Sequence, residues 1–184
     1  KGADLGSLTG SQVYSSIWYK IIDSAAGEPQ IYNFINNDTG TEEISYWVGS
    51  FENVDQTNVF DVTPVWSNVQ NTSAPAAPSV TTVSDGAFVI AAWGIMLDDS
   101  VTMPGGDWVT FAEDVNISDR SLNVVGRRFA TAGATGDVSV TGGSTDDVNV
   151  GQFALRPASA AVAEGIIDMD LYQNRVIVRH EDID

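Results

Sequence analysis

Three short apolar runs near the N-terminus alternate with polar breakers. They are SSIWYKII at 15–22, QIYNFIN at 30–36 and EISYWVGSFENV at 43–54. Each run is rich in Ile, Val, Trp, Tyr and Phe, which fit the pleated, half-buried surface of a strand, and turn-forming residues separate the runs. Strands this close together, joined by short polar turns, form antiparallel meanders. The pattern therefore predicts a three-stranded meander over residues 15–55, around which the rest of the chain is arranged.

The alternation within these runs places large side chains on both faces of the predicted strands. In the first run Ile17 and Tyr19 share one face, whereas Trp18 and Lys20 share the other. Successive side chains of a strand point to opposite faces, and a strand that faces water on one side has a polar face there. We therefore expect these strands to be covered twice, by a second sheet and by a loop or a neighbouring subunit.

Further strand-like runs follow along the chain. The most apolar, AFVIAAWGI at 87–95, is typical of a central strand. Turn signals recur roughly every 8–12 residues, no long helical pattern is present, and no fixed repeat is found. The pattern predicts an all-β chain folded as an antiparallel β-sandwich, jelly-roll-like. The other predicted strands lie at 59–62, 80–83, 108–112, 122–132, 137–142 and 148–157.

The same pattern divides the chain into three parts. Residues 1–14 are rich in Gly and Ser and are predicted to be an N-terminal arm or an edge strand, and residues 15–157 form the sandwich domain. Residues 158–184 follow a break at Arg156-Pro157 and end in IIDMDLYQNRVIVRH, which predicts a C-terminal β-hairpin extension. We expect this extension to pack on a neighbouring molecule or a larger assembly.

Composition restricts the partners of the chain. Its 25 acidic residues against 8 basic ones give a net charge of −17, which repels phosphate backbones and anionic lipid headgroups. We therefore predict no nucleic-acid partner and no membrane partner. No apolar window of about 18 residues is present, so no membrane-spanning helix is predicted. The absence of cysteine excludes disulfides, thiolate metal sites and cysteine nucleophiles.

A series of short motifs runs through residues 15–157. They are Ile17-Trp18-Tyr19-Lys20, Tyr32-Asn33-Phe34, Phe51-Glu52-Asn53-Val54-Asp55, Phe60-Asp61, Ala77-Pro78-Ser79-Val80-Thr81-Thr82, Asp85-Gly86-Ala87 and Phe153-Ala154-Leu155-Arg156-Pro157. In this order the motifs resemble a loose group of β-sandwich domains in bacteriophage structural proteins, often tail- or surface-associated, and in related bacterial surface proteins. The motifs are structural, so the resemblance carries no active-site residues to this chain.

The resemblance implies a non-enzymatic virion protein that works by assembly, as a head decoration, surface-fibre or tail-associated subunit. Its partners would be copies of itself and other virion proteins, and its location the surface of the extracellular particle. Two departures stand out. Glu52-Asn53 occupies the place where the group often has Arg-Gly before Val-Asp, and a leading strand pair is lacking or replaced by residues 1–14.

Acidic loop residues raise the possibility of a bound calcium ion, the one cofactor predicted. Between 53 and 61, Asn53, Thr57 and two aspartates supply oxygen ligands at alternate positions, the ligand type that calcium prefers. The run lacks the central Gly and terminal Glu of an EF-hand, and acids in solvated turns are the competing interpretation. The candidate metal ligands are Asp55, Asp61, Asp98 and Asp99.

No catalytic residues are predicted. The chain has no G-x-S-x-G serine motif, and Gly142-Gly143-Ser144 lacks the Gly-Lys-Ser/Thr ending of a phosphate loop. Two carboxylates about 5–9 Å apart could hydrolyse a glycosidic bond, so a glycan hydrolase remains an alternative. However, 25 acids in 184 residues make neighbouring pairs such as Asp146-Asp147 inevitable without any catalytic role.

The five tryptophans suggest a second alternative. Trp18, Trp47 and Trp93 lie inside predicted strands and are interpreted as packing residues, either in the core or between subunits. Trp66 and Trp108 are predicted in or beside loops, where an exposed indole could stack on a sugar ring. They are the candidate carbohydrate-binding residues of a lectin-like module that recognises host surface glycans, with calcium as its candidate cofactor.

Overall fold

The computed structural model describes residues 3–9, 14–22, 45–95, 101–113, 121–142 and 147–158. All regular secondary structure within these ranges is antiparallel β-strand, which confirms the prediction of an all-β chain. The strands are β1 (Ala3–Thr9), β2 (Tyr14–Tyr19), β3 (Val65–Val69), β4 (Ala76–Ala77), β5 (Phe88–Ile95), β6 (Val109–Glu113), β7 (Ser121–Arg128), β8 (Val138–Ser139) and β9 (Val148–Leu155).

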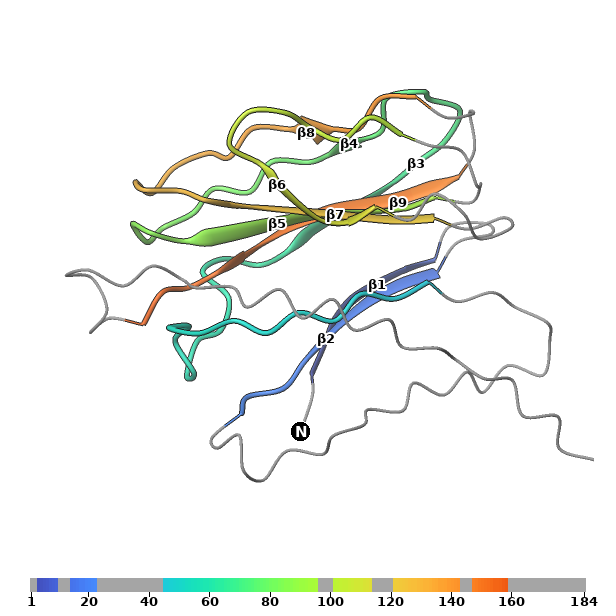
Figure 1. Ribbon diagram of the computed structural model, residues 1–184. Coiled ribbons are helices and arrows are strands. Elements are labelled where there is room, and N and C mark those ends of the chain that lie inside the picture. The colour runs from blue at the N-terminus through green and yellow to red at the C-terminus, as the bar shows by residue number, and fades with distance from the viewer. Residues whose placement is uncertain are drawn as a thin grey trace, which may run out of the picture.

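A five-stranded sheet with the order β3-β9-β5-β7-β6 lies in the middle of the molecule (Figure 1). Its central strand, β5, pairs along its whole length with β7 on one side and β9 on the other. This strand comes from the most apolar run of the sequence, and its predicted central position is confirmed. The next strand, β9, is buried at all of its positions, because the sheet continues on both sides of it and both faces are covered.

The face of this sheet that carries Trp93, Val125 and Val150 is here called the upper face. The two-stranded β4–β8 sheet lies above it in Figure 1. Ala77 of β4 and Val138 of β8 belong to the same buried apolar cluster as these sheet residues. Branched aliphatic side chains dominate this interface, so the core on the upper face is largely apolar. Its remaining buried members are Ala91, Ile95, Val101, Val140 and Val148.

The opposite, lower face is covered by the β1–β2 hairpin and by residues 45–62, which run beneath the sheet in Figure 1. Two glycines of the sheet make room for aromatic rings on this face. A Cβ on Gly126 would overlap the Phe111 ring and would lie 2.7 Å from the Phe88 ring, and a Cβ on Gly151 would overlap Trp66. Because these two glycines have no side chain, they leave the space that the aromatic rings occupy.

The predicted meander over residues 15–55 is wrong as the organising element. Its first run forms β2, which pairs with β1, and the second run, 30–36, lies outside the described residues. Residues 45–54 of the third run form no strand and make a single bridge, between Val54 and Pro157. These residues carry strand-like side chains because they pack flat on a sheet, not because they belong to one.

Two shorter predicted strands are also reduced to single bridges. Within 59–62 only Phe60 pairs, with Leu155, and within 80–83 only Thr81 pairs, with Ala134. The run at 108–112 corresponds to β6, displaced by one residue. The predicted C-terminal hairpin lies outside the described residues. Within the part of the chain that the structure describes, no helix of membrane-spanning length and hydropathy is found.

Candidate functional site

Buried polar side chains fasten the upper layer to the five-stranded sheet. Gln152 of β9 is fully buried, and its Nε2 donates hydrogen bonds to the carbonyl oxygens of Ala77, at 3.0 Å, and Gly136, at 2.9 Å. Its Oε1 accepts a hydrogen bond from Thr135 Oγ1 at 2.8 Å. Buried polar groups are costly when unpaired, and here each polar atom of Gln152 has a partner. Its chemistry is therefore used in holding the layers together.

Asp61 performs a similar task at the end of β9. Its carboxylate is buried and accepts hydrogen bonds from the backbone N–H groups of Val83, at 2.6 Å, and Ser84, at 3.1 Å. Arg156 lies on the other side, with its Nε 3.4 Å from Asp61 Oδ1 and its Nη2 donating to the Asp61 carbonyl oxygen at 3.1 Å. Three segments distant in sequence therefore meet on one carboxylate.

The environment of Asp61 sets its protonation. Burial raises the pKa of the Asp61 carboxyl, but the hydrogen bonds from Ser84 and Val83 and the charge of Arg156 outweigh burial, so its pKa lies below the ordinary value. The group is therefore ionised at neutral pH, and its oxygens already have partners. Asp61 is a structural anion in the described structure, and its sequence-predicted role as a calcium ligand finds no support in this geometry.

Asp55 lies in a tight turn before Asp61. Its Oδ1 accepts hydrogen bonds from the backbone N–H groups of Asn58, at 3.1 Å, and Thr57, at 2.8 Å, which lower the pKa of the Asp55 carboxyl. This is the turn-forming use of aspartate. Asp98 and Asp99 lie outside the described residues. No group of three or more His, Cys, Asp or Glu side chains that could hold a metal ion occurs among the residues described.

The two tryptophans predicted as sugar platforms lie in packed surroundings. Trp66 is not in a loop but in β3, where its half-buried ring covers Gly151 and stacks on Phe153 at a centroid distance of 6.5 Å. Trp108 precedes β6, is half-buried, and meets Phe129 edge-to-face at 6.2 Å. Both rings therefore use at least one surface for packing within the chain, which is the role that sequence reasoning had assigned to the other tryptophans.

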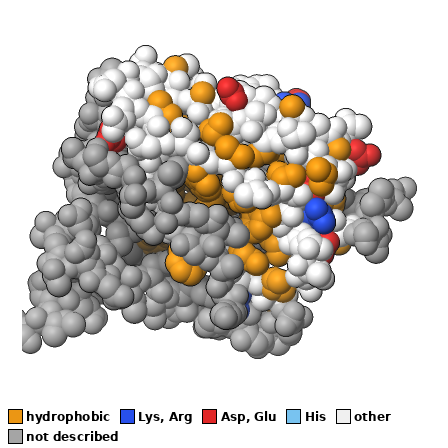
Figure 2. Space-filling view, turned by 180° about the vertical axis from the view of Figure 1, so that it is seen from behind, with side chains coloured by type: hydrophobic (Ala, Val, Ile, Leu, Met, Phe, Trp, Pro, Cys, Tyr) orange, Lys and Arg blue, Asp and Glu red, His pale blue; other side chains and the backbone are white. Residues whose placement is uncertain are grey.

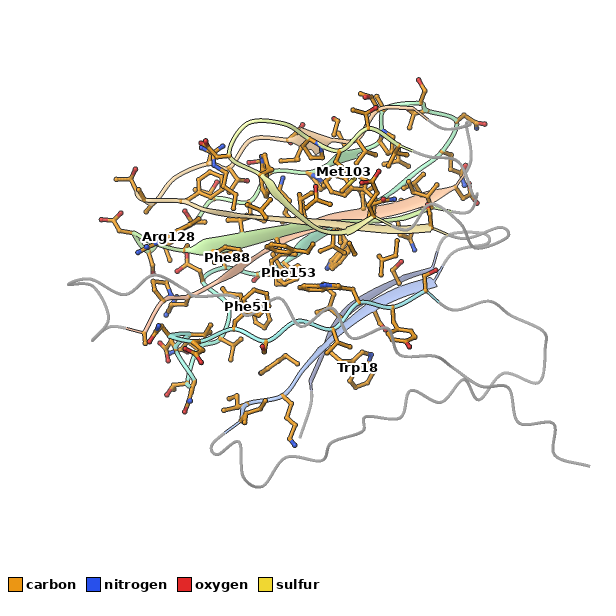
Figure 3. The ribbon with its side chains drawn as sticks, in the orientation of Figure 1. Trp18, Phe51, Phe88, Met103, Arg128 and Phe153 are labelled. Carbon is orange, nitrogen blue, oxygen red and sulfur yellow. The ribbon has the colours of Figure 1, made fainter. Side chains whose placement is uncertain are left out.

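Trp18 is an exposed indole, so the core alternative of its predicted packing role is wrong, while packing between subunits stays a prediction. Its side chain is 64% exposed, and its Nε1 donates a hydrogen bond to Ser16 Oγ at 3.0 Å. Figure 3 shows Trp18 on the side of β2 away from the five-stranded sheet. The sequence feature that could have indicated this exposure is the alternation of Trp18 with Ile17 and Tyr19, which are half-buried. Trp18 instead shares its side of the strand with the charged Lys20.

The inner face of β2 anchors the hairpin to the molecule. Tyr19 meets Phe60 edge-to-face at 5.4 Å, and Phe60 meets Phe153 of the sheet at 6.3 Å. The chain of rings continues to Trp66. Aromatic pairs in such arrangements contribute about 0.5–1.5 kcal/mol each beyond their buried area. The position of the outer β2 face, where Trp18 lies, is therefore set by packing that reaches the centre of the sheet.

Within the described ranges, three buried polar atoms at the start of β7 have no hydrogen-bond partner: Ser121 Oγ, Asn123 Oδ1 and Asn123 Nδ2. Asn123 pairs in register with Trp93 on one side and with Glu113 on the other. Unpaired buried polar groups cost about 1–3 kcal/mol each. We interpret this position as a point of weakness in the upper core.

Comparisons with known proteins found no relative from which a function could be assigned. No protein-family model matches the chain, and searches of curated proteins and of solved structures gave no match.

Proposed function

We propose that this chain is a non-enzymatic structural protein that acts by assembly, with its layers arranged as a jelly-roll-like antiparallel sandwich. The motif resemblance across residues 15–157 favours a bacteriophage particle, where the chain would be a head decoration, surface-fibre or tail-associated subunit. It would lie on the virion surface, in contact with copies of itself and with other virion proteins.

One observation carries the proposal. Two polar side chains buried in the described core, Gln152 and Asp61, are committed to joining layers, while the outer side of β2 leaves an indole in water. Catalysis requires polar groups poised for a substrate, whereas assembly requires an uncovered apolar surface on a rigid support. Trp18, with Ile22 at 45% exposure close by in the chain, provides such a surface.

The charge distribution agrees with this proposal. Figure 2 shows hydrophobic side chains over the centre of one face of the molecule, with the few visible acidic side chains toward its margins. Among the described residues, strands β1 and β6 contain one acid each, Asp4 and Glu113, and the other described acids lie in the connections between strands. Charge at the ends of the layers keeps particles dispersed while strand faces stay available for contacts.

The test is the oligomeric state of the purified chain. Sedimentation velocity from about 1 to 100 µM, at low and at moderate salt, is expected to show a concentration-dependent increase in mass. Salt should strengthen association, because it screens repulsion between copies that each carry −17. A monomer across this whole range would refute the proposal. Immunogold labelling of the native particle then tests the virion location.

Carbohydrate binding is the second candidate, and a specific observation favours it. The Trp18 ring is exposed and is oriented by its hydrogen bond to Ser16, as a stacking platform for a sugar requires. A glycan array, run with and without a calcium chelator, separates this function from assembly. Binding that is lost in Trp18→Ser, with the oligomeric state unchanged, would establish it. A hydrolase would in addition release a reducing sugar.

A further inference from the structure

The β1–β2 hairpin is a layer of its own on the lower face of the five-stranded sheet (Figure 1). Within the described residues its two strands pair with each other, and neither of them pairs with a strand of the five-stranded sheet. The pairing is irregular between Asp4 and Ser7, where the register shifts. A two-stranded hairpin is only marginally stable in water, so this one depends on its packing against the rest of the molecule.

Few large side chains provide that packing. Ile17 packs against the apolar cluster of the lower face, and Tyr19 meets Phe60 edge-to-face. Trp18 lies between them on the outer side, and residues 20–22 are exposed. Of the β2 side chains that the structure describes, none is fully buried, and the sequence of β1, ADLGSLT, contains only two large apolar residues. The apolar contact that holds the hairpin is therefore small.

The other covering segments are joined to the sheet by hydrogen bonds as well as by packing. On the lower face, the backbone of residues 53–61 makes hydrogen bonds of 2.8–2.9 Å with residues 154–158, at the end of β9. On the upper face, the Gln152 amide binds the carbonyl oxygens of Ala77 and Gly136. Segments with few buried contacts open at a lower free energy than segments fastened in this way. The hairpin is therefore the layer that should open first.

A buried polar atom on the lower face opposes closure. Trp66 belongs to the same apolar cluster as Ile17, and β1 lies beside β3, the strand that carries Trp66. The Trp66 Nε1 atom is buried, and no hydrogen-bond partner for it is found among the described residues. A buried N–H without an acceptor costs free energy, and water provides an acceptor once this layer is open. The closed and open arrangements are thus brought closer in free energy.

We propose that the β1–β2 hairpin is a lid on the lower face, which opens and recloses while the five-stranded sheet and the upper layer stay folded. Opening separates Tyr19 from Phe60 and admits water to the aromatic rings of the lower face. The movement takes place within a single chain, so the inference goes beyond the proposed function and does not depend on it.

Amide hydrogen exchange of the full-length chain measures the opening of each strand separately. At about 1 µM protein, the hydrogen-bonded amides of β1 and β2 should exchange at least about a hundredfold faster, relative to their intrinsic rates, than those of β5 and β9. Urea below the unfolding transition should accelerate exchange in β5 and β9 and leave the hairpin rates nearly unchanged, because opening the hairpin exposes little surface. Equal protection with the same urea dependence would overturn the proposal. A hairpin without any protection would overturn it as well, since a closed lid would not form.

Three variants separate the lid from the rest of the molecule. Tyr19→Ala and Trp18→Ala are a matched pair, because these aromatic residues are neighbours on opposite sides of β2. Tyr19→Ala should lower the protection of the hairpin about tenfold, and Trp18→Ala less than about threefold. Equal losses would contradict the closed geometry of the lid.

Gln152→Ala weakens only the attachment of the upper layer, which stays intact when the lid opens. It should lower the protection of β5 and β9 and leave that of the hairpin unchanged. A parallel loss in the hairpin would show that the hairpin opens only with the whole domain, and would overturn the inference. If Gln152→Ala does not fold, the urea series on the wild-type chain makes the same comparison. The sedimentation test of the proposed function is independent of each of these results.

Discussion

Replacing Asp61 with alanine tests whether the layers are held by a buried anion. The Asp61 carboxylate accepts hydrogen bonds from the N–H groups of Val83 and Ser84, and its side chain is fully buried beside the partly exposed Arg156. Removal of the carboxylate leaves both N–H groups without their acceptor and Arg156 without its counter-charge. The segments around 61, 83 and 156 would then lose their common attachment.

The contacts set the size of the expected effect. Hydrogen bonds to charged groups contribute about 1.5–3 kcal/mol each, and removing one partner of a buried ion pair costs about 3–5 kcal/mol in total. We therefore expect Asp61→Ala to lower the free energy of unfolding by about 3–5 kcal/mol. Asp61→Asn keeps a neutral acceptor oxygen, and we expect about 2–3 kcal/mol. Asp107→Asn is the control, because Asp107 is an exposed partner of Arg127 at 2.9 Å, and exposed pairs contribute about 0–1 kcal/mol.

The measurement is equilibrium unfolding in urea, followed by tryptophan fluorescence and circular dichroism, between pH 7 and pH 3. The pKa of Asp61 is lowered in the folded state, so the unfolded chain binds the proton more readily. The stability that Asp61 gives is complete above the unfolded pKa, ordinarily 3.8, and is lost as the pH falls through the lower folded value. Wild-type stability should therefore decline more steeply below about pH 4 than that of Asp61→Asn.

The result that would refute this reasoning is specific. If Asp61→Ala unfolds within about 1 kcal/mol of the wild type, as Asp107→Asn should, the buried carboxylate is not what joins these segments. Parallel pH profiles for the wild type and Asp61→Asn would lead to the same conclusion by an independent route, since an unshifted carboxyl contributes no pH dependence to folding.

Three further predictions concern positions with distinct surroundings. Gly126→Ala should cost about 1–3 kcal/mol because its Cβ would overlap the Phe111 ring, whereas Gly105→Ala, with open space around its Cβ, should be neutral in the same urea titration. Asn123→Leu should raise the thermal midpoint, since it removes two unpaired buried polar atoms, and a lower midpoint would show that they have partners in solution. The Asp55 carboxyl should titrate by NMR below its ordinary value, whereas in Asp55→Glu the longer side chain would lose the turn and titrate normally.

The hydrophobic pattern correctly predicted the central strand of the sheet, but it wrongly predicted a strand in a segment that covers the sheet. The run at 87–95 became β5 because eight mostly apolar residues can be buried on both faces only in the middle of a sheet. Residues 45–54 have the same strand-like composition, yet they pack across the lower face through Trp47, which stacks on Phe111 at 5.7 Å. Alternation reports which side chains are buried, and it does not report whether the backbone has a hydrogen-bonding neighbour.

The functional residues were harder to predict, because partners distant in sequence decide their roles. Asp61 was a reasonable oxygen ligand by spacing, but Arg156 lies 95 residues away and the N–H donors lie at 83 and 84. Trp66 was predicted in or beside a loop, although it belongs to β3 and covers Gly151. The need for a glycine under an indole becomes visible only when the two strands are brought side by side, as their register shows.

The chain itself covers both faces of its five-stranded sheet, and this changes the physical basis expected for assembly. The sequence suggested that aromatic strand faces await cover from sister molecules, but Trp47 and Trp66 are covered in part by the chain itself. The exposed large hydrophobic side chains on the described strands are Trp18 of β2, Val65 of β3 and Val109 of β6, which do not form a large apolar surface. Association between molecules that each carry −17 through such small surfaces should be reversible and strengthened by salt. An obligate oligomer, by contrast, buries a large apolar interface and has no stable folded monomer. Within the proposed function, we therefore expect a subunit that folds alone and assembles afterwards.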